Sequence, residues 1–231
     1  SRLNFIFNLN ITKKRPLLAL KLAESSNGKL SEVAGKTSRV TEVEARLDVM
    51  HWRRLFPAIC VGSGTVLADN PSLTSRQTKG TFCPVRLVLD SSLRTLHETV
   101  SPRNLYRDAF TSKTIILTTA SGMNNLKAVK KAHESGINLI ELGQQENGQI
   151  QLNEIPDFLK KLNLNALYFE GGSRVANSLL KEGLVDYLFR YQSPKIFSGP
   201  NVLPGPDLDS FPLREPIEVQ LGEDRIIHGF L

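Results

Sequence analysis

Short apolar runs alternate with amphipathic segments along this chain, and this pattern constrains the fold more than any other feature of the sequence. Each run is short enough for a strand, and most runs end near a glycine, a proline or a charged residue. The expected strands span residues 17–23, 58–61, 84–90, 114–118, 137–142, 166–169 and 185–191. The expected helices span residues 42–55, 123–135, 155–162 and 174–181. Strands that alternate with helices form a mainly parallel sheet, so the sequence predicts one α/β domain.

The first and last strand signals predict the centre and one edge of this sheet. Residues 17–23 are apolar apart from Lys21, which is typical of a central strand covered on both faces. A charged residue in such a strand lies near the end of the strand or has a function. Residues 217–221 and 226–230 flank a turn-like tetrapeptide and predict a terminal antiparallel hairpin.

The helix expected at residues 42–55 has boundary signals of its own. Thr41 is the expected N-cap, and Glu44 three residues later completes a capping box. Pro57 then predicts the end of the helix.

Composition excludes some classes of function and leaves others open. The net charge of +6, from 29 basic and 23 acidic residues, indicates either an anionic partner or a scattered basic surface. No dense block of Lys and Arg with interleaved aromatic residues occurs, so we expect no nucleic-acid binding, and a phosphorylated small molecule fits the charge at least as well. No run of 18 apolar residues occurs, which predicts no membrane span.

The cysteines and histidines give no sign of a metal centre or a nucleophile. Cys60 and Cys83 cannot make a disulfide framework, and Cys60 lies in an apolar run, which predicts a packed thiol in a protein of a reducing compartment. The four histidines stand apart, without metal spacing and without a serine–aspartate partner: His51, His97, His133 and His228. An enzyme of this kind leaves the difficult chemical step to a cofactor.

Three polar, glycine-bearing segments are expected beyond the carboxyl ends of the strands, where ligands bind in open α/β sheets. They are residues 23–37, 62–76 and 170–178. The segment 62–76, with sequence GSGTVLADNPSLTSR, combines two glycines with an aspartate, an asparagine and an arginine, and it predicts a loop that wraps a small polar ligand. The triplet GKT in the first segment is not a phosphate-binding loop, because Leu30 stands where that motif requires glycine.

Each candidate in these segments also has a structural interpretation. Two glycines at residues 171–172 before a helix let backbone N–H groups approach a phosphate, or they serve only a tight turn. Glu170 is either functional or an acid that complements the helix dipole. Asp69 lies in an Asx turn before Pro71 or contacts a ligand. Arg53 is either a solvated charge or a ligand contact, and the same holds for Arg76.

Six segments in order resemble the reductase half of the deaminase-reductases of riboflavin biosynthesis. They are LALKLAESSNGK, GKTSRVT, GSGTVLADNPSLTSR, PVRLVLDSSLR, LYFEGGSRVANSLL and LVDYLFRYQSPKIFSG, and they cover the chain from Arg15 to about Gly199. The resemblance implies a dihydrofolate-reductase-like α/β fold and the NADPH-dependent reduction of 5-amino-6-(5-phosphoribosylamino)uracil. In that reaction a hydride reaches ribose C1′ of the ring-opened imine and gives the 5-phosphoribitylamino product.

The resemblance also implies roles for residues of this chain. Cofactor contacts are expected at Ala23, Arg39, Thr65, Asp69, Ser91, Gly172, Ser173, Arg174, Val175, Ala176, Asn177 and Ser178. Substrate contacts are expected at Thr37, Arg53, Leu73, Arg76 and Glu170. Two arginines suit a substrate phosphate, because a guanidinium fork binds phosphate oxygens in pairs. The reduced nitrogen needs a nearby proton donor or cation, and the candidates are Lys21 and Asp69.

Two positions depart from the family pattern. Asn27 stands where the family usually has an aspartate, and Arg39 stands where it usually has a tryptophan. Arginine cannot pack on a cofactor ring as tryptophan does, but it can pair with a phosphate. The hypothesis is that Arg39 contacts the cofactor at its 2′-phosphate. A domain that has drifted to weak activity is the alternative.

The zinc signature of the deaminase half is absent from this sequence. We therefore expect residues 1–14 to be a connector from a missing deaminase domain and residues 15–231 to be the reductase domain of a cytoplasmic bifunctional protein. The resemblance suggests a homodimer joined at the edge of the C-terminal strands. The alternatives are another NADPH reductase on the same fold, such as dihydrofolate reductase, and a non-catalytic nucleotide-binding domain. Arg53 and Arg76 argue against a pterin substrate, which carries no phosphate.

Overall fold

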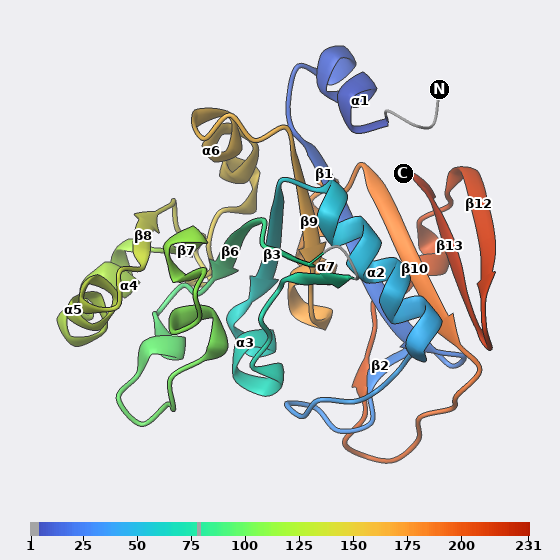
Figure 1. The fold of residues 1–231 in the computed structure, drawn as a ribbon, viewed down its shortest axis with the longest axis horizontal. Helices are drawn as coiled ribbons and strands as arrows, with labels where there is room; N and C mark the ends of the chain where they lie inside the picture. The colour runs from blue at the N-terminus through green and yellow to red at the C-terminus, as the bar shows by residue number, and fades with distance from the viewer. Residues whose placement is uncertain (1–4, 78–79) are drawn as a thin grey trace.

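The computed structural model describes residues 5–77 and 80–231 (Figure 1). Within these residues a nine-stranded sheet has the order β12-β13-β10-β1-β9-β3-β6-β7-β8. The strands are β1 Leu17–Ser25, β3 Ala58–Gly62, β6 Val85–Leu89, β7 Thr114–Thr118, β8 Asn138–Glu141, β9 Ala166–Glu170, β10 Tyr187–Ser193, β12 Arg214–Leu221 and β13 Asp224–Phe230. The neighbours from β10 to β8 are parallel, and β13 is antiparallel to both β10 and β12. The predicted α/β class, the parallel centre and the C-terminal antiparallel hairpin are confirmed.

The helices and two small strand pairs complete the fold. The α-helices are α1 Phe5–Lys13, α2 Val43–Leu55, α3 Ser63–Asp69, α4 Ala120–Met123, α5 Leu126–Glu134, α6 Ile155–Lys161 and α7 Ser173–Lys181. The paired short strands are β2 Lys29–Ser31 with β11 Leu203–Pro204, and β4 Ser75–Gln77 with β5 Gly80–Phe82. Short 3₁₀ helices span Arg94–Leu96, Asn104–Tyr106, Thr111–Lys113, Leu152–Glu154 and Leu208–Ser210. In the described part of the chain, no helix combines the length and the apolar character that crossing a membrane requires.

The order of the strands determines where a ligand can bind. From β3 the chain adds β6, β7 and β8 outward, and it then returns to insert β9 between β1 and β3. The carboxyl ends of β1, β9, β3 and β6 therefore lie side by side at one edge of the sheet. Ligand sites of open α/β sheets form at such a crevice.

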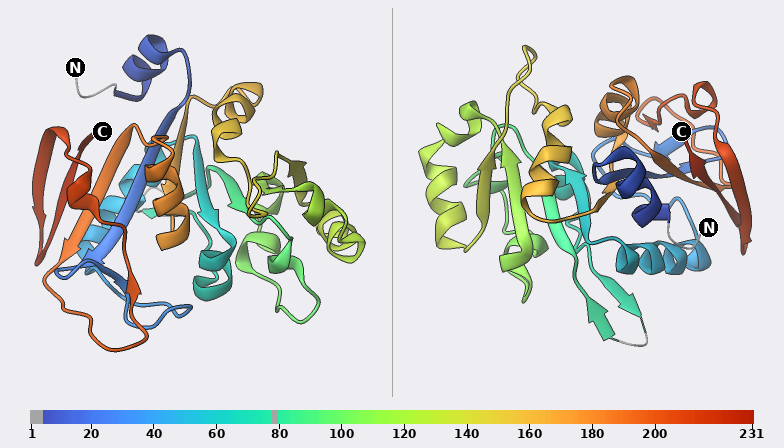
Figure 2. Two further views of the ribbon diagram at one scale, coloured as in Figure 1. Left: turned by 180° about the vertical axis from the view of Figure 1, so that it is seen from behind. Right: turned by 90° about the horizontal axis from the view of Figure 1, so that it is seen from above.

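The helices cover both faces of the sheet, and residue alternation along the strands matches this. On β1, Leu17 and Ala19 pack in the cluster that includes side chains of α2, α3 and α5, whereas Leu18 and Leu20 pack with α6 and α7. Figure 2 shows the sheet from behind and from above, with α2 and α7 on opposite faces. By the same alternation Lys21 lies on the α2 face.

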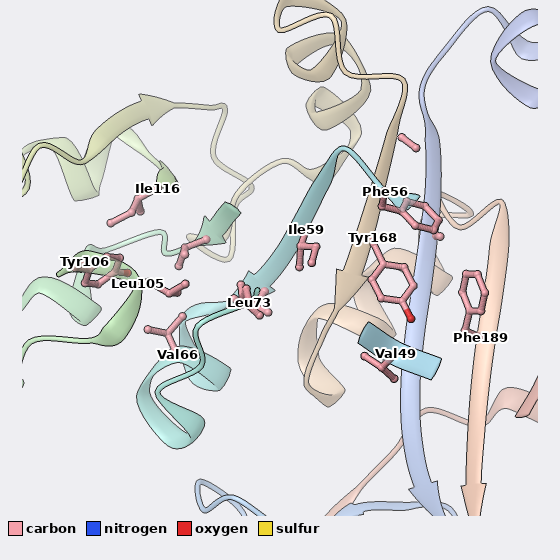
Figure 3. Close-up of a cluster of buried hydrophobic side chains, with 14 of the residues drawn as sticks. Val49, Phe56, Ile59, Val66, Leu73, Leu105, Tyr106, Ile116, Tyr168 and Phe189 are labelled. Atoms are coloured by element: carbon pink, nitrogen blue, oxygen red, sulfur yellow. The ribbon is translucent and has the colours of Figure 1, made fainter. Parts of the chain in front are cut away.

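Large buried side chains hold α2 against the sheet (Figure 3). Val49 of α2 and Phe56 after it lie over Ile59, Tyr168 and Phe189, all of them buried. Burying each of these apolar side chains contributes about 1.5–3 kcal/mol. The packing fixes α2 along this face of the sheet, and the side chain of Arg53 in its last turn reaches Glu170 at the end of β9.

Helix α1 packs on the domain. The Phe5 ring lies 4.6 Å from the Tyr187 ring, centroid to centroid. Both Lys13 and Arg15 form ion pairs with the carboxylate of Asp186, at 2.9 and 2.7 Å. Residues 1–4 of the expected connector lie outside the described residues.

The prediction of a continuous loop over residues 62–76 was wrong, because this segment contains helix α3. Its glycines and its proline resemble a loop signal, but Val66 is fully buried in the core, and this packing favours the helical turn. Asn70 ends the helix in the left-handed conformation at φ 44°, which asparagine tolerates better than most residues.

The predicted capping box was also wrong. Helix α2 has Glu42 as its N-cap, without a side-chain hydrogen bond, and Thr41 is buried. The N–H of Glu42 instead donates to Asp224 Oδ2 at 2.6 Å, from the turn of the C-terminal hairpin. A carboxylate at a helix N-terminus also complements the helix dipole.

Two further boundaries differ from the prediction. The helix expected at residues 123–135 begins only at Leu126 as α5, after a separate short helix α4 that ends at Met123, because Asn125 caps α5 by accepting a hydrogen bond from the N–H of Ala128 at 3.2 Å. Strand β10 continues to Ser193 because its register with β1 continues to Ser25.

Candidate active site

A cavity of about 660 Å³ lies at the carboxyl ends of the central strands. Its volume is in the range of small-molecule sites. Thirteen of the expected site residues line it: Lys21, Ala23, Arg53, Thr65, Asp69, Leu73, Ser91, Glu170, Gly172, Ser173, Arg174, Val175 and Ser178. The structure therefore brings together most of the residues that the sequence singled out, from β1, α2, α3, β9, α7 and the loops after α3 and β6.

Five expected site residues lie outside the cavity lining: Thr37, Arg39, Arg76, Ala176 and Asn177. Thr37 is adjacent to it, since its Oγ1 donates to Asp69 Oδ1 at 2.9 Å. Arg39 and Arg76 are exposed, and Arg76 lies in the β4–β5 hairpin. Ala176 is fully buried in the core on the inner face of α7.

Several lining residues were not among the expected site residues: Leu30, Lys36, Arg94, Gln145, Gln149, Ile150 and Leu203. Arg94 had a weak signal, because it lies in the loop that follows a predicted strand. Gln145 and Gln149 had none, because they belong to an irregular segment between β8 and α6 whose place depends on the tertiary fold. Lys36 belongs to the GKT triplet, and no helix begins there, as the rejection of a phosphate-binding loop predicted.

An ion pair between Arg53 and Glu170 lies in the cavity wall. Arg53 is in the last turn of α2, and Glu170 is the last residue of β9. Arg53 Nε and Nη2 donate to the two carboxylate oxygens at 2.6 and 2.7 Å. Burial alone raises the pKa of Glu170, but the charge and hydrogen bonds of Arg53 outweigh burial, so the net pKa is lowered and the carboxylate stays ionised.

Lys21 lies beside this pair, because it stands opposite Glu170 in the β1–β9 register. Its Nζ also lies 5.5 Å from the ring centroid of Tyr191. Burial lowers the pKa of Lys21; Glu170 and Asp69 oppose this effect, and the charge of Arg53 adds to it. The ammonium group therefore gives up its proton more readily than a solvated lysine does.

The ring of Tyr191 lies beneath the ammonium group of Lys21, and Asp48 holds this ring by a hydrogen bond. The Tyr191 hydroxyl donates to Asp48 Oδ2 at 2.6 Å, and Trp52 Nε1 donates to the same oxygen at 3.1 Å. Tyr191 is fully buried, and these hydrogen bonds hold its ring in one orientation. The position of the lysine is thus defined by packing on a rigid ring.

Glycines bring the end of β3 against the first turn of α7. A Cβ on Gly62 would lie 2.9 Å from Val175 Cγ2, so a larger residue there would force the two segments apart. The carbonyl of Gly172 accepts the α7 hydrogen bond of Ala176, while the N–H groups of the first turn of α7 have no helical partners. Such a turn suits a phosphate group.

The described residues contain no cluster of three or more His, Cys, Asp or Glu side chains that could hold a metal ion. Cys60 is fully buried, and burial raises the pKa of its thiol, so the prediction of a packed thiol is confirmed.

Five basic and two acidic side chains line the cavity in the described part of the chain: Lys21, Lys36, Arg53, Arg94, Arg174, Asp69 and Glu170. The cavity suits an anionic ligand.

The fold and the cavity define a class of protein: a mainly parallel α/β domain with a cationic ligand site at the carboxyl ends of its strands. The model of one family, described as the RibD C-terminal domain, matches residues 16–223. RibD of Actinobacillus pleuropneumoniae is 32% identical over 197 residues, which are 85% of this chain and 50% of that protein. The 2,5-diamino-6-ribosylamino-4(3H)-pyrimidinone 5′-phosphate reductase of Archaeoglobus fulgidus is 30% identical over 194 residues, 80% of this chain and 83% of that protein.

The solved structure of Acinetobacter baumannii RibD, form 1, has the same fold. It superposes with a TM-score of 0.77 at 22% identity and covers 100% of this chain and 62% of that chain. The present chain belongs to the RibD C-terminal domain family. It spans about half the length of RibD relatives such as the Actinobacillus pleuropneumoniae protein.

Proposed function

We propose that this chain catalyses the NADPH-dependent reduction of 5-amino-6-(5-phosphoribosylamino)uracil to its 5-phosphoribitylamino product, a step of riboflavin biosynthesis. The observation that carries the proposal is the position of Lys21 beside the Arg53–Glu170 pair in a cationic cavity. The relative in Archaeoglobus fulgidus, which matches this chain along most of its length, is named as a reductase of a ribosylaminopyrimidinone phosphate.

The residues of the cavity fit NADPH, which supplies a hydride when it is bound. In the proposal the first turn of α7 binds the pyrophosphate, because its N–H groups have no helical partners and Gly62 lets the end of β3 pack closely against this turn. The hydroxyls of Thr65 and Ser91 lie in the same lining. The remaining cofactor contacts in the proposal are those of the cavity-lining residues of α7.

Lys21 has the position of a proton donor. When a hydride is added to the imine carbon, the electron pair of the C=N bond moves to nitrogen, and this nitrogen takes up a proton. A lysine with a lowered pKa is matched to that step better than a solvated lysine, because its proton is released more easily near neutral pH. Asp69 acts on Lys21 through its negative charge and holds Thr37 by a hydrogen bond.

Glu170 and Arg53 form a polar surface for the substrate. The carboxylate can accept hydrogen bonds from the pyrimidine N–H edge, and the guanidinium keeps an N–H for a substrate oxygen. Leu73 supplies an apolar contact from the loop after α3. Thr37 and Arg76 complete the proposed substrate contacts, although Arg76 lies on the exposed hairpin outside the lining.

The proposal includes the wider setting of the domain. Because RibD relatives are about twice as long as the matched region, the proposal includes a second domain in the same polypeptide. By the family resemblance, this domain is a deaminase and the protein is cytoplasmic. A homodimer through the exposed edge strand β12 is part of the same proposal, since β12 is the last strand of the sheet and is exposed along most of its length.

The test is the consumption of NADPH by the purified chain, followed by its near-ultraviolet absorbance. We expect consumption only when 5-amino-6-(5-phosphoribosylamino)uracil is added, and its loss in Lys21→Met. The matched control is Lys130→Met, which removes an exposed lysine of α5. Consumption with dihydrofolate alone favours a dihydrofolate reductase, and NADPH binding without any consumption favours a non-catalytic domain. Either result contradicts the proposal.

A further inference from the structure

The sequence assigned the 2′-phosphate of the cofactor to Arg39, but the structure places this side chain outside the cavity lining and in solvent. Its backbone carbonyl accepts a hydrogen bond from Lys195 Nζ at 3.0 Å, and its neighbours Ser38 and Val40 line the cavity, but Arg39 does not. Another arginine, Arg94, does line the cavity.

Arg94 stands on a rigid turn at the end of β6. The carboxylate of Asp90 accepts hydrogen bonds from the N–H groups of Arg94 and Thr95 at 3.1 and 2.8 Å, and from Thr95 Oγ1 at 2.7 Å. The carbonyl of Ser91 is held by the hydroxyls of Thr118 and Thr119 at 3.1 and 2.9 Å. The backbone that carries Ser91 and Arg94 is therefore fixed before any ligand arrives.

The side chain of Arg94 crosses the cavity wall toward α3. Its Nε donates to Ser63 Oγ at 2.9 Å, and its Nη2 lies 3.5 Å from the position of a Cβ built on Gly64. Within the described residues, no carboxylate lies within ion-pair distance of Arg94, and the two terminal nitrogens have no hydrogen-bond partner. Two serine hydroxyls and a guanidinium with free N–H groups make a donor set that suits a phosphate monoester.

The place of Arg94 relative to Lys21 matches the length of a dinucleotide. Lys21 is on β1, and β9 and β3 separate β1 from β6. Three strand spacings of about 4.8 Å separate β1 from β6 by roughly 14 Å across the sheet, and Arg94 lies five residues beyond the end of β6. The first turn of α7, which suits the pyrophosphate, lies between them. A dinucleotide with its reactive ring at Lys21 thus has its adenosine end near Arg94.

The acidic residues of the lining support the same orientation. Sites for NAD place a carboxylate on the 2′-hydroxyl of the adenosine ribose, whereas an arginine there accommodates the 2′-phosphate of NADP. The two acids in the described lining, Asp69 and Glu170, are both near Lys21. Asp90, the acid closest to Arg94 in sequence, is buried and bonded to its own turn. Among the described residues, no carboxylate lines the cavity at this end.

We propose that Arg94, with the hydroxyls of Ser63 and Ser91, binds the 2′-phosphate of the cofactor and so selects NADPH over NADH. This inference rests on the proposed function, because it takes the cavity to be a dinucleotide site.

The test is direct binding by isothermal titration calorimetry, independent of turnover. Wild type, Arg94→Gln and Arg39→Gln are titrated with NADPH, NADH, adenosine 2′,5′-bisphosphate and AMP. We expect Arg94→Gln to weaken NADPH and the bisphosphate about 10- to 100-fold, the size of a lost charge-assisted contact, and to leave NADH within about twofold. Arg39→Gln should match wild type with all four ligands.

Arg94→Lys keeps the positive charge but removes the planar guanidinium group, and it also serves as a second variant in which folding can be checked. It should retain part of the preference for NADPH, because the charge remains and the paired N–H geometry is lost. Equal NADPH affinities of wild type and Arg94→Gln overturn the inference, as does an equal loss for NADPH and NADH in Arg94→Gln and Arg94→Lys; in both cases the proposed function stands. Binding of neither dinucleotide by wild type overturns the proposed function, and the inference falls with it.

Discussion

Two arginine–carboxylate pairs of this protein look alike but have different surroundings. Arg53 pairs with Glu170 in the cavity wall, and Arg86 of β6 pairs with Asp108 beyond the end of the sheet. In both, two guanidinium nitrogens donate to the two carboxylate oxygens, at 2.6 and 2.7 Å for Arg53 and at 2.7 and 2.9 Å for Arg86. Both join segments that are distant in the sequence.

The two arginines differ in how many of their remaining N–H groups have partners in the protein. All five N–H groups of Arg86 are used, because it also donates to Thr114 Oγ1 and to the carbonyls of Ser72 and Leu105, each at 3.0 Å. Arg53 has one further oxygen partner, the carbonyl of Thr74 at 3.0 Å, and a longer contact to the sulfur of Met50. Arg86 is closed to ligands, whereas Arg53 is open to one.

A closed network ties loops to the sheet, and an open one keeps a charge ready for a ligand. The cost of burying an arginine is offset in the first case by protein groups alone. In the second case a bound molecule can supply the missing partner. The number of free donors therefore distinguishes a structural arginine from a ligand-binding one.

Breaking the closed pair should have the largest effect. Arg86→Met removes five hydrogen bonds and leaves the Ser72 carbonyl without its donor, while the Leu105 carbonyl keeps the hydroxyl of Thr114, so the free energy of unfolding should fall by about 3–5 kcal/mol. Urea denaturation measures this, with Arg46→Met on the exposed face of α2 as the control. A loss no larger than that of the control would show that the network is not structural. Affinity for NADPH should stay unchanged in the folded variant.

Breaking the open pair, Arg53–Glu170, should reduce activity strongly and stability only slightly. Arg53→Met leaves Glu170 beside the cationic Lys21, so the free energy of unfolding should fall by only about 1–2 kcal/mol. The value of kcat/KM for the pyrimidine substrate should fall about 100-fold. Steady-state kinetics and urea denaturation are measured on the same preparation. A stability loss as large as that of Arg86→Met, with kcat/KM retained, contradicts the distinction.

Lys21 sharpens the contrast, because it stands opposite Glu170 of the open pair. If it acts as an acid, its protonated form is active, and kcat should fall about tenfold per pH unit as the pH rises above its lowered pKa. This limb should begin below pH 10.5, the ordinary pKa of lysine. In Lys21→Arg the charge persists, so the limb should disappear from whatever activity remains. A pH profile with the same limb in both proteins argues against the role.

The smallest expected effect concerns acid stability. Partial burial works to raise the pKa of Asp108, but the hydrogen bonds and charge of Arg86 and the Phe110 N–H outweigh it, so the net pKa is lowered. A lowered pKa means that the stabilisation is present above about pH 4, the unfolded value, and is lost as the pH falls through the folded value. Asp108→Asn should therefore flatten the fall in urea midpoint below about pH 4. An unchanged slope would assign that fall to other carboxylates.

Patterns within a few residues were sufficient to predict most of the sheet. The apolar runs around Leu18, Ile59 and Leu167 identified central strands, because strands buried on both faces consist almost entirely of apolar residues. The Glu170 turn was also predicted as part of the site, and each of these signals depends on neighbours in the sequence. Ser91 in the loop after β6 was expected only from the family resemblance.

What the sequence could not predict depends on distant partners. The N-terminus of α2 is met by Asp224, 182 residues away, and Arg53 meets Glu170 across 117 residues. Helix α3 was missed because Val66 is stabilised by the core and not by local propensity. Arg39 was assigned to the cofactor from the family resemblance, and only the fold shows that Arg94 lines the cavity and Arg39 does not.

The late insertion of β9 has a consequence for synthesis of the protein. Until residues 166–170 leave the ribosome, the edge of β1 and the edge of β3 that later pair with β9 have no neighbouring strand. A nascent chain of that length carries two open, apolar strand edges, which are prone to pair with other chains. The same five residues that join these two strands also deliver Glu170 to Arg53 and Lys21. Assembly of the Lys21–Arg53–Glu170 cluster and pairing of these two edges thus occur in one event, and β10 covers the other edge of β1 only later in translation.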